Sequence, residues 1–124
     1  MKTMKTPLKL GLFLLTLTSY TFALNCQNAE TSYEMKMCEQ KALELADKEL
    51  NLVYKQLMAQ LDDTGKNKLR DAQRKWIQFR DAHAVFEADS MRGGTGEGLL
   101  YTATLKTLTQ DRVKALKAAL YLYQ

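Results

Sequence analysis

The side chains of this sequence that are best suited to chemistry lie in residues 70–87, RDAQRKWIQFRDAHAVFE. This segment contains the only tryptophan, Trp76, the only histidine, His83, and four basic residues. Such a set could transfer protons, bind a nucleic-acid backbone, or form one wall of a helical core in which polar side chains fix the register. These three interpretations imply different partners, and the rest of the sequence helps to separate them.

Catalysis is the weakest of the three interpretations. It needs a positioned acid, base or nucleophile, and His83 lies on a charged helical segment with Phe79 and Glu87 at helical spacing. That setting is more typical of a surface or rim histidine than of a general base. The sequence has one histidine, and its two cysteines are expected to form a bridge. No set of nitrogen and sulfur ligands is therefore left for a metal ion. The glycines of residues 93–98 match no phosphate-binding fingerprint. We therefore predict no enzyme, no metal and no cofactor.

The amino-terminal segment has the form of a signal peptide, residues 1–23. Three lysines precede an apolar stretch of 14 residues, Leu10–Ala23, which ends in a plausible cleavage site at Thr21-Phe22-Ala23. An uncleaved anchor is the alternative, but a membrane span needs about 20 apolar residues. We expect an exported protein, periplasmic or secreted and free of the membrane after cleavage, with one domain in residues 24–124.

The charge balance argues against a nucleic-acid partner. The chain carries 18 basic and 14 acidic residues, but three of the lysines lie in residues 1–23, which contain no acid. Residues 24–124 therefore carry 15 basic against 14 acidic side chains, a net charge of +1. Nucleic-acid binding requires a basic face that releases counterions, and this domain offers little support for one.

The pattern of residues 24–124 predicts helices throughout. Proline is absent from this part of the chain, and Thr31-Ser32-Tyr33-Glu34 has the form of a capping box at the start of a helix. Residues 62–65, DDTG, offer a turn and a new helix cap. Apolar residues at spacings of three and four follow the capping box: Leu43, Ala46, Leu50, Val53, Leu57 and Leu61.

Two further helices are expected on either side of the glycine cluster 93–98. The second should end near Met91, and the third should run from about Leu99 to Leu122. Their expected apolar stripes are Leu69, Ala72, Trp76, Phe79 and Phe86 on the second, and Leu105, Leu108, Arg112, Leu116 and Ala119 on the third. Because short connections force consecutive helices to run antiparallel, we predict an all-α, up-down-up antiparallel bundle of three helices.

The two cysteines constrain the start of the first helix. Two cysteines in an exported chain are typical of one disulfide bridge. If residues 26–38 were all helical, the two Cα atoms would lie about 18 Å apart, whereas a bridge tolerates roughly 7 Å. Either no bridge forms, or the chain doubles back before the helix, as the cap at Thr31 allows.

Polar residues recur on the expected inner faces of the first two helices. They are Asp47, Asn51 and Tyr54 on the first, and Gln73, Trp76 and Arg80 on the second. In a hairpin that turns near residues 62–65, Tyr54 should lie near Gln73, and Asp47 near Arg80. A buried arginine requires an anion and hydrogen-bond acceptors, so we expect Arg80 to be largely buried and paired with Asp47 or Asn51. These side chains either fix the register of the helices, which we favour, or form a binding site.

With these motifs, the sequence resembles a known family, the lysozyme inhibitor LprI-like domain of exported bacterial proteins. The resemblance covers nearly all of residues 24–124. Its first motifs are Cys26-Gln27-Asn28-Ala29, Thr31, Met35, Cys38, Ala46-Asp47, Leu50-Asn51 and Tyr54. Its later motifs are Leu69-Arg70, Ala72-Gln73-Arg74, Trp76-Ile77, Phe79-Arg80-Asp81-Ala82, Phe86-Glu87, Leu105, Leu108-Thr109 and Arg112. The resemblance implies a small helical, exported domain, with lysozyme inhibition attributed to its namesake.

The sequence departs from the family at two positions. Family members usually carry two further cysteines, where this chain has Ala84 and Thr104. Their joint absence suggests that they normally pair and tie the second helix to the third. The resemblance then leaves Cys26 and Cys38 as each other's partners, with a disulfide that ties an amino-terminal arm to the bundle. The loss puts in doubt how rigidly the third helix and its preceding loop are held.

Two functional hypotheses follow from these observations. The first is a binding protein that inhibits a lysozyme or another peptidoglycan hydrolase by steric occlusion. The second is a periplasmic structural or secretion-associated helical module with no lysozyme partner. For the first, a thin element must enter a cleft that contains two carboxylates, and the candidate is the connection 91–98 with Arg92 and Thr95 as donors. Glu97 counts against this loop, and an ordinary connecting loop is the alternative.

Overall fold

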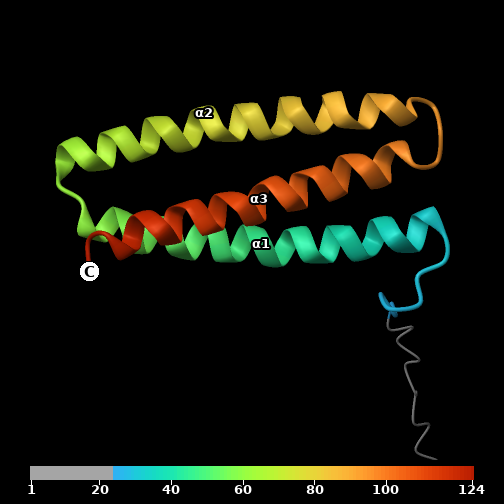
Figure 1. Cartoon of the computed structure of the whole chain (residues 1–124), viewed down its shortest axis with the longest axis horizontal. Helices are drawn as coiled ribbons and strands as arrows, with labels where there is room; N and C mark the ends of the chain where they lie inside the picture. The colour runs from blue at the N-terminus through green and yellow to red at the C-terminus, as the bar shows by residue number, and fades with distance from the viewer. Residues whose placement is uncertain (1–23) are drawn as a thin grey trace, which may run out of the picture.

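A computed structural model describes residues 24–124, which form three long helices (Figure 1). Helix α1 spans Ser32–Gln60, α2 spans Asp63–Ala88, the short 3-10 helix η1 spans Asp89–Met91, and α3 spans Glu97–Tyr121. Helices α1 and α3 run in the same direction and α2 runs opposite to them. The predicted all-α, up-down-up arrangement is confirmed. The predicted signal peptide, residues 1–23, lies outside the described residues.

The start of α1 and the α1–α2 turn follow the expected local chemistry. The Thr31 hydroxyl accepts a hydrogen bond from the Glu34 N–H at 3.1 Å, and the Glu34 carboxylate accepts one from the Thr31 N–H at 3.0 Å. This reciprocal pair is the predicted capping box. Helix α2 begins with a single side-chain cap, in which the Asp62 carboxylate accepts a hydrogen bond from the Gly65 N–H at 2.7 Å.

The disulfide bridge between Cys26 and Cys38 is present, with the two Cα atoms 5.6 Å apart. The arm before α1 doubles back, as a bridge between these positions requires. The bridge therefore attaches residues 26–31 to the first two turns of α1. No helix within residues 24–124 is long and apolar enough to span a membrane.

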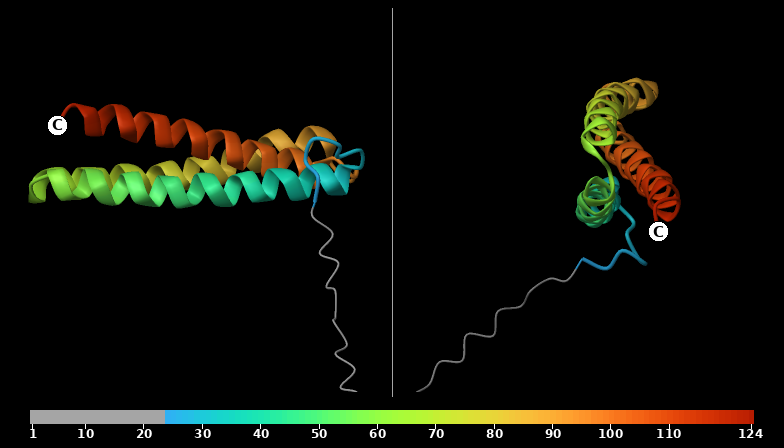
Figure 2. Two further views of the ribbon diagram at one scale, coloured as in Figure 1. Left: turned by 90° about the horizontal axis from the view of Figure 1, so that it is seen from below. Right: turned by 90° about the vertical axis from the view of Figure 1, so that its left-hand side faces the viewer.

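The apolar stripe predicted for α1 forms the core. Helix α3 packs along α1 and also against α2, whereas α1 and α2 scarcely touch each other. The end-on view shows α3 running from beside α2 towards the level of α1 (Figure 2). The buried α1 residues are Leu43, Ala46, Leu50, Val53 and Leu57. The core thus lies mainly between α1 and α3, and α2 covers it only in part.

The apolar stripe predicted for α2 is partly wrong. Leu69 and Trp76 are half-buried, but Ala72 is exposed, and Phe79 and Phe86 are 53% and 70% exposed. The buried residues of α2 are the small Ala84 and Ala88 near its carboxyl end. Small side chains let two helices approach closely, so α2 meets α3 through them and leaves its phenylalanines outside.

Helix α3 begins at Glu97, close to the expected start at about Leu99. A Cβ atom at Gly96 would lie 2.4 Å from the Met91 sulfur. The Met91 side chain therefore packs over Gly96 and brings the end of η1 against the start of α3.

The stripe predicted for α3 also differs from the observed one. Of its five members, only Leu116 is buried, and the other four are half-buried. The buried residues of α3 are Thr102, Thr109, Val113 and Leu116. Helix α3 packs against both α1 and α2. Its most buried residues therefore lie between these two contact faces and are not its most apolar residues.

The double substitution Cys26→Ser, Cys38→Ser is expected to lower the free energy of unfolding by about 3 kcal/mol, because the bridge restricts the unfolded chain. Urea denaturation of the wild type and the variant measures this difference. Intact-mass measurement of freshly purified protein should also show a gain of about 2 Da on reduction. Two free thiols in unreduced protein would contradict the prediction.

The capping box predicts a pH dependence. Hydrogen bonds from the backbone N–H groups of Thr31 and Glu30 lower the pKa of Glu34 from its ordinary value of 4.5. A lowered pKa means that Glu34 stabilises the fold above about pH 4.5 and loses this effect as the pH falls through the lowered value. Glu34→Gln, which does not titrate, should be less stable than the wild type at pH 7. Thermal denaturation between pH 2 and 7 should show this difference shrinking with acid, and a constant difference would refute the assignment.

Candidate functional site

A polar groove of about 330 Å³ lies between α1 and the middle of α2. It exists because these two helices are antiparallel neighbours in sequence but are not packed side by side. Its lining residues are Asp47, Leu50, Asn51 and Tyr54 from α1, and Arg70, Gln73, Arg74, Trp76, Ile77 and Arg80 from α2. All six residues of the predicted polar network line this groove.

Two guanidinium groups lie close to the indole ring of Trp76. The Cζ atom of Arg80 is 5.2 Å from the ring centroid, and that of Arg112, on α3, is 5.7 Å from it. The Arg112 Nε–H also donates to the Gln73 side-chain oxygen at 2.9 Å. Burial lowers the pKa of Arg112, and the ring face and the amide oxygen provide the electrostatic partners that this partly buried cation requires.

Arg80 connects all three helices. Its side chain is 18% exposed, and its Nη1 atom lies 3.4 Å from the Asp47 carboxylate of α1 and 3.4 Å from the Thr109 hydroxyl of α3. Its Nε–H donates to Asp81, on its own helix, at 2.9 Å. Thr109 is fully buried and donates in turn to the Leu105 carbonyl at 2.7 Å.

The remaining predicted network residues line the groove without joining these hydrogen bonds. Among the described residues, no side-chain hydrogen bond reaches Asn51 or Tyr54, so both present their polar atoms to the groove or to solvent. Thr109 was not among the residues expected in the network. The heptad spacing of Thr102 and Thr109, continued by Leu116, was the signal that could have identified it.

His83 takes no part in the groove. Its ring stacks on Phe79, with centroids 5.3 Å apart, and lies 6.0 Å from the ring of Phe86. Its Nε2 atom is 3.5 Å from the Glu87 carboxylate. These residues form an exposed ridge on α2, defined here as Phe79, His83 and Phe86. Within residues 24–124, no group of three or more histidine, cysteine and acidic side chains is placed to hold a metal ion.

The connection between η1 and α3 is a turn in which one of the two expected donors, Arg92, already has a partner. The Arg92 Nε–H donates to the Asp89 carboxylate at 2.7 Å, and the Gly93 N–H donates to the Glu97 carboxylate at 2.8 Å. Gly93 has a φ of 76°, which favours glycine. Glu97, which we expected to oppose binding, lies in the first turn of α3, where the helix dipole stabilises its charge.

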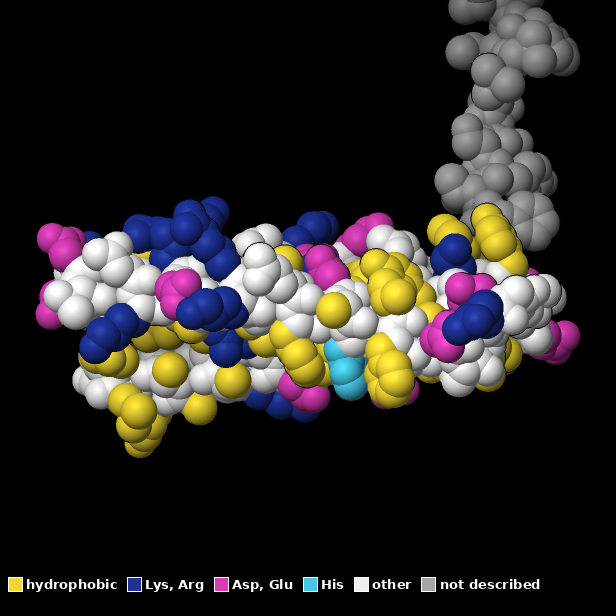
Figure 3. All heavy atoms as spheres, turned by 90° about the horizontal axis from the view of Figure 1, so that it is seen from above, with side chains coloured by type: hydrophobic (Ala, Val, Ile, Leu, Met, Phe, Trp, Pro, Cys, Tyr) yellow, Lys and Arg dark blue, Asp and Glu magenta, His cyan; other side chains and the backbone are white. Residues whose placement is uncertain are grey.

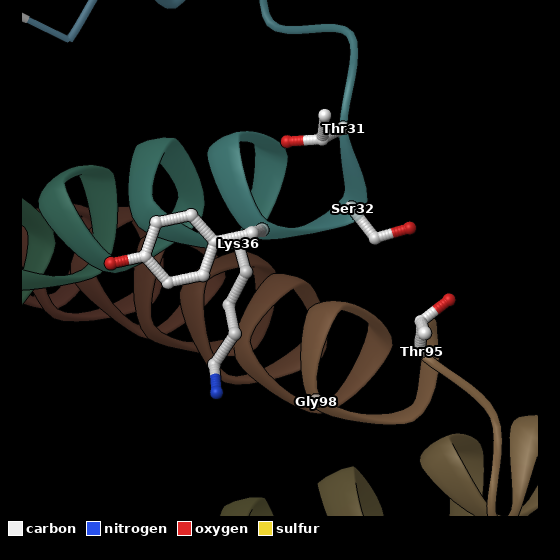
Figure 4. Close-up of a pocket in the computed structure, with 6 residues that line it drawn as sticks. Thr31, Ser32, Lys36, Thr95 and Gly98 are labelled. Carbon is white, nitrogen blue, oxygen red and sulfur yellow. The ribbon is translucent and has the colours of Figure 1, made fainter.

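Thr95 lies at the same end of the molecule as the start of α1. Together with Thr31, Ser32, Tyr33, Lys36 and Gly98, it lines an open hollow of about 510 Å³. In the close-up view, Thr31 and Ser32 at the start of α1 lie across from Thr95 (Figure 4). Tyr33 is 71% exposed, so an aromatic side chain, an ammonium group and three hydroxyls share this surface, which we call the loop end.

These features define a small helical domain with a disulfide-tied amino-terminal arm and no packed α1–α2 pair. Residues 24–116 match the family described as "Lysozyme inhibitor LprI". The chain belongs to the LprI lysozyme inhibitor family.

Similarity to a curated protein extends over much of the chain. An uncharacterized protein of Rhizobium meliloti (strain 1021) is 29% identical over 106 residues, which cover 75% of this chain and 76% of that protein. No solved structure matches the chain.

Arg80→Ala is expected to lower the free energy of unfolding by about 2 kcal/mol, because it removes charge-assisted hydrogen bonds from a largely buried guanidinium. The matched control is Lys75→Ala on the same helix. Lys75 and its partner Asp71 are both exposed, so their ion pair should contribute under about 0.5 kcal/mol to the free energy of unfolding. Chemical denaturation of both variants measures the difference. Equal stability of the two variants would show that Arg80 does not hold the helices together.

Proposed function

We propose that the exported protein binds and inhibits a lysozyme or a related peptidoglycan hydrolase. The observation that carries this proposal is membership of the lysozyme inhibitor LprI family over residues 24–116. The inhibitor acts by steric occlusion and catalyses no reaction itself. The predicted signal peptide and the disulfide bridge support a periplasmic or secreted location.

The loop end is the surface that fits such a role best. The cleft of a lysozyme contains two carboxylates that act on a sugar chain, so an inhibitor that covers it benefits from cations and hydrogen-bond donors. The loop end supplies the Lys36 ammonium group, the Thr95 hydroxyl and the exposed Tyr33, and tyrosine often dominates the energy of interfaces. Arg92 lies nearby in sequence but would have to leave Asp89 to contribute.

A structural or secretion-associated module remains the second candidate function. The exposed ridge of Phe79, His83 and Phe86 on α2 favours it, because aromatic side chains in a row on a helix fit contact with another helix. Seen from the α2 side, hydrophobic and histidine side chains share the face with a cluster of lysine and arginine side chains at one end (Figure 3).

The test measures hydrolysis of peptidoglycan by several lysozymes in the presence of the purified protein. We expect inhibition by the wild type, and a loss of about ten-fold or more in inhibitory potency for the variant Tyr33→Ala, Thr95→Ala. Tyr121→Ala is the control, because Tyr121 is an exposed tyrosine at the far end of α3. The variant Arg92→Ala, Thr95→Ala, checked for unchanged helicity, tests the turn itself.

The outcomes separate the two functions. Inhibition that is equal in the wild type and in all of these variants would exclude the loop end as the inhibitory surface. No inhibition of any lysozyme by the wild type would contradict the proposal and favour the structural module.

A further inference from the structure

The groove between α1 and α2 has a surplus of positive charge. Arg70, Arg74 and Arg80 all line it, whereas Asp47 is the one acidic residue among its lining residues. Arg80 is committed to Asp47 and Asp81. The other two guanidinium groups are therefore available to a ligand.

Neither Arg70 nor Arg74 has a carboxylate partner within residues 24–124. Arg70 Nη1 donates to the neutral Asn67 amide at 2.7 Å, and no ion pair or side-chain hydrogen bond of the described residues involves Arg74. The two arginines are four residues apart on α2 and so point to the same side of the helix. A guanidinium presents a fork of donors that matches a carboxylate.

The other lining residues suit an organic ligand rather than a simple ion. Trp76 and Ile77 offer apolar surface, and Asn51, Tyr54 and Gln73 carry groups that can donate to or accept from an amide. The volume of about 330 Å³ lies at the lower end of the range for small-molecule sites, roughly 300–1,000 Å³. The groove is also preformed, because the Arg80 and Arg112 contacts on Trp76 fix its α2 wall.

We propose that this groove binds a carboxylate-bearing ligand of about the size of a dipeptide. The carboxylate pairs with Arg70 and Arg74, the apolar part lies against Trp76 and Ile77, and the amide groups reach Asn51 or Gln73. The same chemistry occurs in acidic peptide segments and in the short peptides of peptidoglycan. The site is separate from the loop end and does not rest on lysozyme inhibition.

Tryptophan fluorescence provides a direct test, because Trp76 is the only tryptophan of the chain and lines the groove. The mature protein is titrated with N-acetyl-alanyl-glutamate, and with the neutral N-acetyl-alanyl-glutamine amide as the comparison. We expect a saturable change with the acid and binding weaker by about ten-fold or more with the neutral compound. No saturable change, or equal binding of both compounds, would overturn the proposal.

Two charge-matched double variants show whether binding of the acid depends on the two groove arginines or only on the overall positive charge of α2. Arg70→Gln, Arg74→Gln should weaken binding of the acid by about ten-fold or more. Lys68→Gln, Lys75→Gln removes the same charge from exposed positions of α2 that do not line the groove, and it should bind as the wild type does. All four positions are exposed, so circular dichroism should show unchanged helicity. An equal loss in both variants would refute a built site.

A third titration identifies the source of the carboxylate. A soluble disaccharide-peptide released from peptidoglycan is compared with N-acetyl-alanyl-glutamate. Tighter binding of the peptidoglycan fragment assigns the site to cell-wall peptides, whereas weaker binding of the fragment assigns it to acidic protein segments. If inhibition of lysozymes fails while this binding holds, only the proposed function is lost.

Discussion

Two guanidinium groups against one indole ring hold this molecule in its shape. Arg80 and Arg112 both lie close to the Trp76 ring. Arg80 also contacts Asp47 on α1 and Thr109 on α3. Arg112, on α3, donates a hydrogen bond to Gln73 on α2. Before Ala84, α2 contributes no fully buried residue, and of its apolar side chains Leu69 and Trp76 pack in part on the core. Because partly buried cations need partners, the contacts of Arg80 and Arg112 help to fix where the middle of α2 lies.

An open three-helix arrangement follows from this polar attachment. Helix α3 fills the space beside α1 with apolar and threonine side chains, and the fully buried residues of α2 are Ala84 and Ala88 near its carboxyl end. The part of α2 held by polar contacts stays apart from α1, which leaves the groove between them. The same arrangement leaves Phe79 and Phe86 outside. The molecule thus presents two separate surfaces, a polar groove in the middle and the loop end.

Sequence reasoning succeeded where the physics is local. The capping box at Thr31, the turn at residues 62–65 and the stripe from Leu43 to Leu57 follow from hydrogen bonds and spacings within a few residues. The resemblance supplied the pairing of the two cysteines, which the distance along a helix left open. Placing the six polar residues along one groove needed only the antiparallel direction of α1 and α2, which the short turn imposes.

Sequence reasoning failed where a helix face could have more than one neighbour. Periodicity shows which residues share a face, but it does not show which face another helix will cover. The exposed phenylalanines of α2 and the buried Thr109 are consequences of that choice. So is the open groove: Arg70 and Arg74 belong to an ordinary charged helix face in the sequence, and they line a groove only because α3, not α2, packs along α1. Packing between distant segments settles these features, since close-packed contacts depend on the shapes of all three helices at once.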